Sequence, residues 1–335
     1  MTQSSHRILL VSPVFHGYWR AVSAALSSRG HRVVVHNYDA PGTLRGRVEN
    51  KLQWEFGGNR IGRWAGAKLT ERVVACIRST KPTAVLVIKG DQLGEAFWHE
   101  LEAQKIPTVL WLYDELDRMS YAPEAIAGRA PIVSYSRGDV ATLRNAGANA
   151  TYLPDAFDSL SPVRRINVDA VTFVGARYPK RERLVRGLHD AGVPVRAYGR
   201  EWSRRPIDVV RSRRFAPAGV PWGPDLARPD YYGVMAGSKA TLNIHGDAHE
   251  GFSMRTFEAP GVGGLQLIDR PDVGELYEPG EELLVFESLE ELIDLSKRAR
   301  RERAWARRVA QAGQRRTLAE HTFIHRMQTV EALWA

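Results

Sequence analysis

The chain has 335 residues, enough for two domains, and its apolar fraction of 44% and charged fraction of 25% are those of an ordinary globular protein. No apolar run approaches the ~18 residues that a membrane-spanning helix needs, and the N-terminus lacks the features of a signal peptide. The single cysteine, Cys76, excludes an intramolecular disulfide and a cysteine-based metal site. We therefore expect a cytoplasmic protein.

A formal net charge of +9 favours anionic partners. Nucleic acid, an anionic membrane face and a nucleoside diphosphate all fit this charge. Much of the excess lies in three clusters, at residues 177–186, 200–214 and 297–308. The last has helical spacing with Glu302 between its cations, which is typical of a solvated helix face.

The N-terminal half alternates short apolar runs with amphipathic segments. The first strand is predicted at 7–11, and it is followed by a helix at 19–28 that Gly30 closes. Further strands are predicted at 32–36, 84–88, 107–112, 132–135 and 150–153. Uninterrupted β-branched runs of this kind are typical of a parallel sheet that is buried on both faces, and they indicate an α/β fold.

The same rhythm begins again after a polar stretch at 154–167 that contains two prolines, where we place the linker. Strands are predicted at 170–175, 193–198, 239–245, 264–269 and 283–286, with a helix at 181–191. We expect two Rossmann-like domains that face each other across a cleft, at 1–157 and 168–314, and a C-terminal helix at 315–335 that can pack back on the first domain. No Gly-x-Gly-x-x-Gly follows the first strand, which argues against a nicotinamide or flavin site.

The densest signal runs from Leu242 to Ala259 and predicts a strand, a polar loop with two glycines, and a helix with Ser253 as its N-cap. A helix N-terminus beside such a loop offers N–H groups and a positive dipole to a phosphate. Glu250 and Glu258 stand seven residues apart around this point. Two carboxylates so placed suit a ligand with hydroxyls at both ends and phosphates between, although a capping carboxylate and a solvated one would give the same spacing.

Several stretches of the C-terminal half together resemble the CgeB-like glycosyltransferases, which are GT-B enzymes with a Glu-x7-Glu signature. They are Asn243–His245, Gly251–Glu258, Gly263–Asp269, Leu276–Glu282 and Gly313–Thr322. The resemblance spans residues 170–325 and is looser over the N-terminal half.

The resemblance implies a retaining enzyme that takes a sugar from a nucleoside diphosphate sugar and uses no other cofactor. Glu258 would then bind the ribose and Glu250 the donor sugar. The backbone amides of Phe252, Ser253 and Met254 would meet the pyrophosphate, within a donor site that also includes Gly251 and Arg255.

Such enzymes also carry basic residues after the first strand of the C-terminal domain, where they stabilise the leaving diphosphate. Here the corresponding segment is 173–181, and we select Arg177 and Lys180, with Arg181 behind them. The family's usual spacing is not reproduced here, and an exposed basic turn is the alternative. No Asp-x-Asp stands in a suitable loop, so we expect catalysis without a metal ion.

Further candidates follow other predicted strands. His16 and Gly17 come after the first strand, where glycine permits close approach to a ligand and histidine can bind the donor or act in acid–base chemistry. Asp91 and Asp114 are acceptor-side candidates, and His245 can touch the donor sugar. We name His16, Asp114 and Glu250 as the catalytic candidates, although both histidines also fit structural roles.

Two other functions remain open at this point. A glycosyltransferase acting on DNA or nucleobases would use the aromatic and basic residues of 202–205 and 211–214, with Trp222 nearby. The second of these functions is that of a protein that binds a nucleotide but catalyses no reaction. The base and sugar of the donor and the hydroxyl acceptor are not determined by the sequence.

Overall fold

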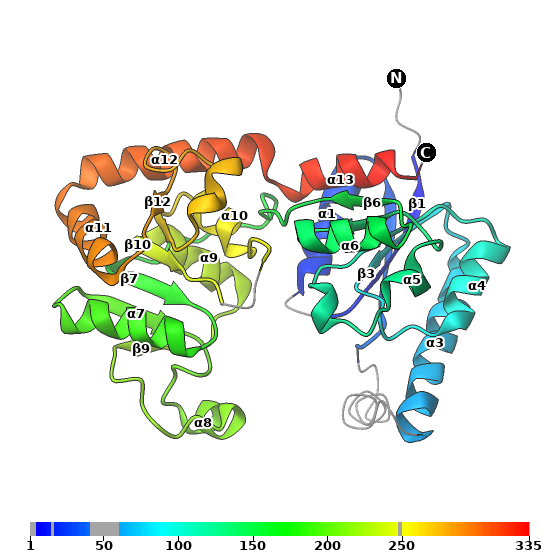
Figure 1. Ribbon diagram of the computed structural model, residues 1–335, viewed down its shortest axis with the longest axis horizontal. Helices are drawn as coiled ribbons and strands as arrows, with labels where there is room; N and C mark the ends of the chain where they lie inside the picture. Colours follow the sequence, from blue (N-terminus) through cyan, green and yellow to red (C-terminus); the bar gives the residue numbers. More distant parts are fainter. Residues whose placement is uncertain (1–4, 15–16, 41–59, 247–249, 335) are drawn as a thin grey trace. The chain divides into compact units, whose positions relative to one another are not determined.

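The structure is a computed structural model, and it describes residues 5–14, 17–40, 60–246 and 250–334 (Figure 1). The chain forms two compact units, one made of Met1–Asp155 with Phe323–Ala335 and the other of Ala156–Thr322. Most of the expected linker, 156–167, therefore belongs to the second unit, and so do residues 315–322. Along the described ranges, no helix is both long enough and apolar enough to cross a membrane.

The first unit is built on a six-stranded parallel sheet with the order β2-β1-β3-β4-β5-β6. Its strands are β1 Arg7–Ser12, β2 Arg32–Asn37, β3 Ala84–Ile88, β4 Thr108–Trp111, β5 Ile132–Ser134 and β6 Ala150–Tyr152. The helices of this unit are α1 Tyr18–Ser28, α3 Arg60–Thr80, α4 Glu95–Ala103, α5 Pro123–Ile126, α6 Arg137–Asn145 and α13 Phe323–Ala332, with a 3₁₀ turn, η2, at Leu116–Arg118.

The central strands of this sheet have no solvent-facing side, as their apolar sequences predict. All five residues of β3 are buried, because helices cover both faces of a parallel sheet. The last helix, α13, packs on α1, and the Trp334 indole just beyond it donates a hydrogen bond to the Val85 carbonyl oxygen at 3.1 Å. The end of the chain thus completes the first unit.

The second unit repeats the architecture, with the strand order β12-β11-β10-β7-β8-β9, all parallel. Its strands are β7 Val168–Val174, β8 Val195–Tyr198, β9 Trp222–Gly223, β10 Ser238–Asn243, β11 Gln266–Ile268 and β12 Leu284–Val285. Its helices are α7 Pro179–Asp190, α8 Pro206–Ser212, α9 Arg228–Gly237, α10 Arg255–Gly261, α11 Leu289–Arg301 and α12 Arg303–Glu320, with a 3₁₀ turn, η3, at Pro271–Glu275. The two-residue strand β9 was not expected, since it is too short to give a periodic pattern.

Candidate functional site

The candidate donor residues of the second unit lie where three neighbouring strands end. Gly175 follows β7, Ile244 and His245 follow β10, and Asp269 follows β11. The register places Leu242 beside Phe173 and Asn243 beside Ile268, so the residues that come next meet at one edge of the sheet. In parallel sheets this carboxyl edge is where ligands bind.

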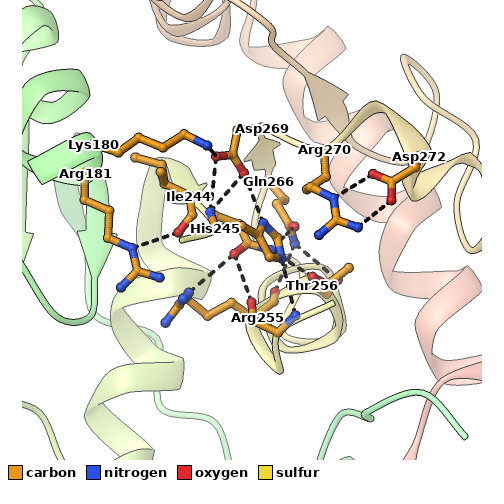
Figure 2. A network of polar contacts seen from close by, with 12 residues as sticks. Lys180, Arg181, Ile244, His245, Arg255, Thr256, Gln266, Asp269, Arg270 and Asp272 are labelled. Atoms are coloured by element: carbon orange, nitrogen blue, oxygen red, sulfur yellow. Dashed lines mark hydrogen bonds and ion pairs between the residues drawn. The ribbon is translucent and has the colours of Figure 1, made fainter. Parts of the chain in front are cut away.

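A buried amide network joins this edge to α10 (Figure 2). The Asn243 amide donates to Thr256 Oγ1 at 2.9 Å and to Gln266 Oε1 at 3.0 Å. The Gln266 amide donates in turn to the carbonyl oxygens of Arg255 and Thr256. Because buried polar groups are costly without partners, this network fixes the first turn of α10 against β10 and β11.

His245 holds the loop that precedes α10. Its Nδ1 lies 3.0 Å from Asp269 Oδ1, and its Nε2 accepts the Ser253 backbone N–H at 3.3 Å. Asp269 is also paired with Lys180 at 2.8 Å. Both ring nitrogens are therefore engaged inside the protein, and contact of His245 with the donor sugar stays a prediction.

The protonation states follow from this arrangement. Burial lowers the pKa of His245, and the hydrogen bond to Asp269 only partly opposes it. Burial alone would raise the pKa of Asp269, but hydrogen bonds from His245 and Lys180 hold it below its usual value. A neutral imidazole thus donates from Nδ1 to a carboxylate, and the Lys180 charge is balanced by that carboxylate. We accordingly do not assign Lys180 to the donor phosphates.

The expected N-cap at Ser253 is wrong. Helix α10 begins at Arg255, its N-cap position is Met254, and no side chain caps it. The Ser253 hydroxyl instead donates to Asn243 Oδ1 at 3.2 Å. Since the Ser253 N–H is also bound to His245, this residue serves the internal network rather than a phosphate.

Arg177 is likewise committed to the protein. Its guanidinium forms a two-point ion pair with Glu182, at 2.9 and 2.8 Å, and its Nη1 donates to the Ala216 carbonyl oxygen at 2.8 Å. The residue is buried, with its guanidinium facing the Trp202 ring. Its donors thus hold the segment around residue 216 in place, and the selection of Arg177 for the diphosphate stays a prediction.

Two other arginines converge at the carboxyl edge. Arg181 on α7 is buried, and its Nε donates to the Ile244 carbonyl oxygen at 2.8 Å. Arg255 lies so close to Gly175 that a Cβ on this glycine would stand 3.1 Å from Arg255 Nη1. Burial, and next the positive charge of Arg255, lower the pKa of Arg181 to about 10. In the part of the chain that the structure describes, neither guanidinium forms an ion pair.

Glu258 is fully buried on α10. Its carboxylate accepts hydrogen bonds from the Tyr231 hydroxyl at 2.5 Å and from the Tyr232 hydroxyl at 3.4 Å. Both tyrosines come from α9, and sequence reasoning missed them because nothing in the local pattern links α9 to α10. Tyr231 is half-buried, so it stands between Glu258 and solvent.

Glu250 has the opposite surroundings. Its side chain is exposed, and its carbonyl oxygen accepts a hydrogen bond from Arg270 Nη2 at 2.8 Å. The same arginine stacks on the Phe252 ring at 4.6 Å, and Phe252 and Gly251 are buried. Arg270 therefore holds the backbone at Glu250 and the ring of Phe252, while the Glu250 side chain is exposed.

The candidates of the first unit follow β1, β3 and β4. His16 lies outside the described residues. Gly17 is the N-cap of α1 in a left-handed conformation, with φ 69°, and its N–H donates to the Val14 carbonyl oxygen at 2.9 Å. Any other residue would be strained in this backbone conformation, which explains why position 17 is a glycine.

Asp91 and Asp114 lie at the ends of β3 and β4, which are neighbours in the sheet. Asp114 pairs with Lys89 at 2.9 Å, and Lys89 and Tyr113 both have positive φ, 64° and 59°. Burial raises the pKa of Asp91, which Lys89 only partly offsets. One buried oxygen of Asp91 has no hydrogen-bond partner among the described residues. Two residues with positive φ and one carboxylate oxygen without a hydrogen-bond partner mark this edge as a candidate acceptor region.

No group of three or more His, Cys, Asp or Glu side chains within the described ranges is arranged to hold a metal ion. The aromatic part of the suggested nucleic-acid surface is not available either. Trp202 is buried and its Nε1 donates to the Gly175 carbonyl oxygen at 2.8 Å, while Trp222 packs against the core. Trp202 therefore presents no open face on which a base could stack, and Trp222 is partly buried.

Comparisons with known proteins agree with this architecture. Residues 177–332 match a family model described as Glycosyl transferase-like. HepE of Anabaena in complex with UDP-glucose aligns over 98% of this chain and 100% of its own, with a TM-score of 0.67 and 14% identity. Sucrose-phosphate synthase from Thermosynechococcus elongatus aligns over 97% of this chain and 98% of its own, with a TM-score of 0.64 and 15% identity.

A DNA-modifying β-glucosyltransferase is also similar in structure, over 98% of this chain and 97% of its own, with a TM-score of 0.54 and 11% identity. No curated protein matches the chain in sequence. The whole chain therefore has the GT-B fold, with one parallel six-stranded sheet in each α/β unit, and residues 177–332 are similar to the glycosyl transferase-like family.

Proposed function

We propose that the protein is a CgeB-like glycosyltransferase that moves a sugar from a nucleoside diphosphate sugar to a hydroxyl acceptor, with retention and without a metal ion. The family match of residues 177–332 and the fold shared with HepE and sucrose-phosphate synthase support this class of reaction. Retention rests on the Glu-x7-Glu resemblance, and metal independence on the cations that the protein itself supplies.

The observation that carries the proposal is the convergence of Arg181 and Arg255 beside Gly175. Arg181 is buried and Arg255 is half-buried, and two guanidinium groups so placed repel each other unless an anion lies near both. A diphosphate is such an anion, and arginine binds phosphate oxygens through paired N–H groups. Fixed cations at this point would stabilise the charge that grows on the leaving diphosphate as the glycosidic bond breaks.

The remaining groups have roles consistent with this placement. Glu258, oriented by the tyrosine hydroxyls of α9, is assigned to the ribose, and a displaced Tyr231 hydroxyl would give a ribose hydroxyl access to its carboxylate. Glu250 is assigned to the donor sugar. On the acceptor side, Asp91 and Asp114 are assigned to the attacking hydroxyl, and the raised pKa of Asp91 makes its carboxylate a stronger proton acceptor than an ordinary aspartate.

Donor binding can be tested in two steps. A thermal-shift panel of nucleoside diphosphates and their sugars identifies the base, because a ligand that binds the folded state alone raises its apparent stability. Calorimetry with the best ligand then compares wild type with Arg181→Ala and Arg255→Ala. The matched control is Arg183→Ala, an exposed arginine on the same helix as Arg181.

We expect each site variant to weaken binding by about tenfold or more, since a hydrogen bond to a charged group contributes roughly 1.5–3 kcal/mol. Arg183→Ala should bind like wild type. Equal affinity in all four proteins would remove the diphosphate from this position, and a panel without any stabilising nucleotide would refute the proposed donor class. Folding of each variant is checked by urea denaturation.

A further inference from the structure

One segment of the second unit, residues 204–215, exposes large apolar side chains to an unusual degree. The exposed fractions are 57% for Ile207, 70% for Val210 and 77% for Phe215. These are the three most exposed large apolar side chains among the residues that the structure describes. Their concentration in nine consecutive residues, rather than scattered singly, indicates an interaction surface.

Helix α8 and the residues that follow it place these side chains on the protein surface. Ile207 and Val210 stand three residues apart on α8 and so share one of its faces, whereas Asp208 is buried on the other side. Phe215 follows the helix directly before Ala216, whose carbonyl oxygen is held by Arg177 at 2.8 Å. In the sequence, helix α8 comes between β8 and β9. In the structure, it lies at the β9 edge of the sheet of its unit (Figure 1).

The same segment is strongly basic. It contains five exposed arginines, and its only acidic residue is the buried Asp208. Within the described ranges none of the five arginines forms an ion pair. They are Arg204, Arg205, Arg211, Arg213 and Arg214. The positive charge of this surface is therefore not balanced by the protein.

A partner for residues 204–215 has to accept aliphatic side chains and offer negative charge at the same place. Single-stranded nucleic acid offers the charge, but it binds through stacking on aromatic faces, and Phe215 is the only aromatic side chain of the segment. The interface of a bilayer with anionic lipids offers both features, because acyl chains accept Ile and Val while headgroups attract arginine.

We infer that residues 204–215 dock the protein on a membrane surface that contains anionic phospholipid. Ile207, Val210 and Phe215 enter the headgroup and acyl boundary, and the arginines bind the lipid phosphates. This inference is independent of the sugar-transfer reaction, because it involves no residue assigned to the donor or acceptor.

Co-sedimentation with vesicles tests the inference. The vesicles consist of phosphatidylcholine alone or of phosphatidylcholine with phosphatidylglycerol, and the test variant is Ile207→Ser/Val210→Ser/Phe215→Ser. Leu160→Ser/Val163→Ser/Leu318→Ser is the matched control, because it removes three other exposed apolar side chains of the same unit. We expect wild type and control to bind the mixed vesicles, and the test variant to bind at least about tenfold more weakly, given roughly 0.8 kcal/mol per buried methylene group.

A second pair of variants tests the charges. Arg204→Ala/Arg205→Ala/Arg211→Ala should lose at least about tenfold in binding to the mixed vesicles, since each arginine near an anionic surface contributes about 1 kcal/mol. Arg301→Ala/Arg307→Ala/Arg308→Ala removes the same charge from the exposed surface of α11 and α12 and should retain most of the affinity.

Three results would overturn the inference. They are absence of binding to mixed vesicles, equal binding by test and control variants, and binding of a single-stranded oligonucleotide that the segment variants lose while vesicle binding is unchanged. Because the assay needs no nucleotide sugar, its failure leaves the proposed transfer reaction untouched, and the converse also holds.

Discussion

The two acidic residues of the Glu-x7-Glu pattern differ sharply in their surroundings. Glu258 is fully buried and bound by two tyrosine hydroxyls, whereas Glu250 is exposed in the loop. A charge-assisted hydrogen bond inside a protein is short and strong, so the tyrosines stabilise the fold as well as orienting the carboxylate. The pattern therefore combines one structural and one solvent-facing carboxylate.

This difference predicts that the two glutamates contribute unequally to stability. Glu258→Ala should lower the free energy of unfolding of the second unit by about 1–3 kcal/mol, because it leaves buried hydroxyls without their acceptor. Glu250→Ala should leave that free energy unchanged within error. Urea denaturation followed by circular dichroism measures both, and equal stability of the two variants would contradict the buried pairing.

The burial of His245 predicts a pH effect on stability. Because burial lowers the pKa of His245, the unfolded chain takes up a proton here more readily than the folded protein. The associated stability is present at pH 7 and is lost as the pH falls through the unfolded value of about 6.5. His36 has a pKa lowered in the same direction, so His245→Gln should remove only part of the slope.

Thermal denaturation of wild type and His245→Gln between pH 7.5 and about 5.5 measures this effect. We expect the stability of wild type to fall more steeply than that of the variant over this interval. Parallel curves would show that His245 keeps its ordinary pKa in the folded protein.

At the scale of elements, the position of α10 depends on close contact with α12. Gly313 on α12 faces the Glu282 backbone so closely that a Cβ would overlap the Glu282 carbonyl oxygen, and Pro260 of α10 lies on the same side. Backbone cannot move aside as a flexible side chain can. This contact sets how near α12 lies to the helix that carries Arg255 and Glu258.

Gly313→Ala should therefore destabilise the second unit by about 1–3 kcal/mol, as overpacking usually does. Gly128→Ala is the control, because a Cβ there meets no atom within 4 Å, and it should be neutral or slightly stabilising. Chemical denaturation of both variants is the measurement, and a neutral Gly313→Ala would show that α12 can shift.

Strands and helices were largely predictable from the sequence, whereas the partners of individual arginines were not. The apolar runs located β1, β3 and β7 within one or two residues, because burial on both faces of a parallel sheet leaves an unbroken pattern. By contrast, Arg177 and Arg181 are two arginines of one basic segment, and the sequence does not distinguish them. Only the structure shows that the Arg177 guanidinium binds the Ala216 carbonyl oxygen.

Asp269 could have been found in advance. It follows the strand next to the one that His245 follows, and ends of neighbouring parallel strands meet. Tyr231 and Tyr232 could not, because their contact with Glu258 joins two helices whose packing no local pattern encodes. The cap at Ser253 failed because a buried network competed for its hydroxyl.

At the scale of the whole molecule, the first unit is closed by the last residues of the chain. Glu331 on α13 accepts hydrogen bonds from Arg29, at 2.5 and 2.6 Å, and lies 3.0 Å from His31 Nε2. Chain ends usually fray unless they are tied to the fold, and this buried group ties α13 to the loop after α1. Helix α13 is thus part of the fold of the first unit.

We expect Glu331→Ala to lower the stability of the first unit by about 2 kcal/mol or more, because it leaves a nearly buried guanidinium without its carboxylate. Glu320→Ala, which removes an exposed helix pair with Arg316, should have little effect. Pulse proteolysis in urea reports the unfolding of each unit separately, through the fragments that remain intact. Equal protection of both variants would show that α13 is dispensable for the first unit.

The central claim is that a nucleoside diphosphate binds at the carboxyl edge of the second sheet with its phosphates between Arg181 and Arg255. A crystal structure of the protein with the nucleoside diphosphate selected by thermal shift tests this most directly. We predict diphosphate oxygens within hydrogen-bonding distance of both guanidinium groups, beside Gly175. A diphosphate bound elsewhere, with the two arginines contacting only protein, would contradict the account.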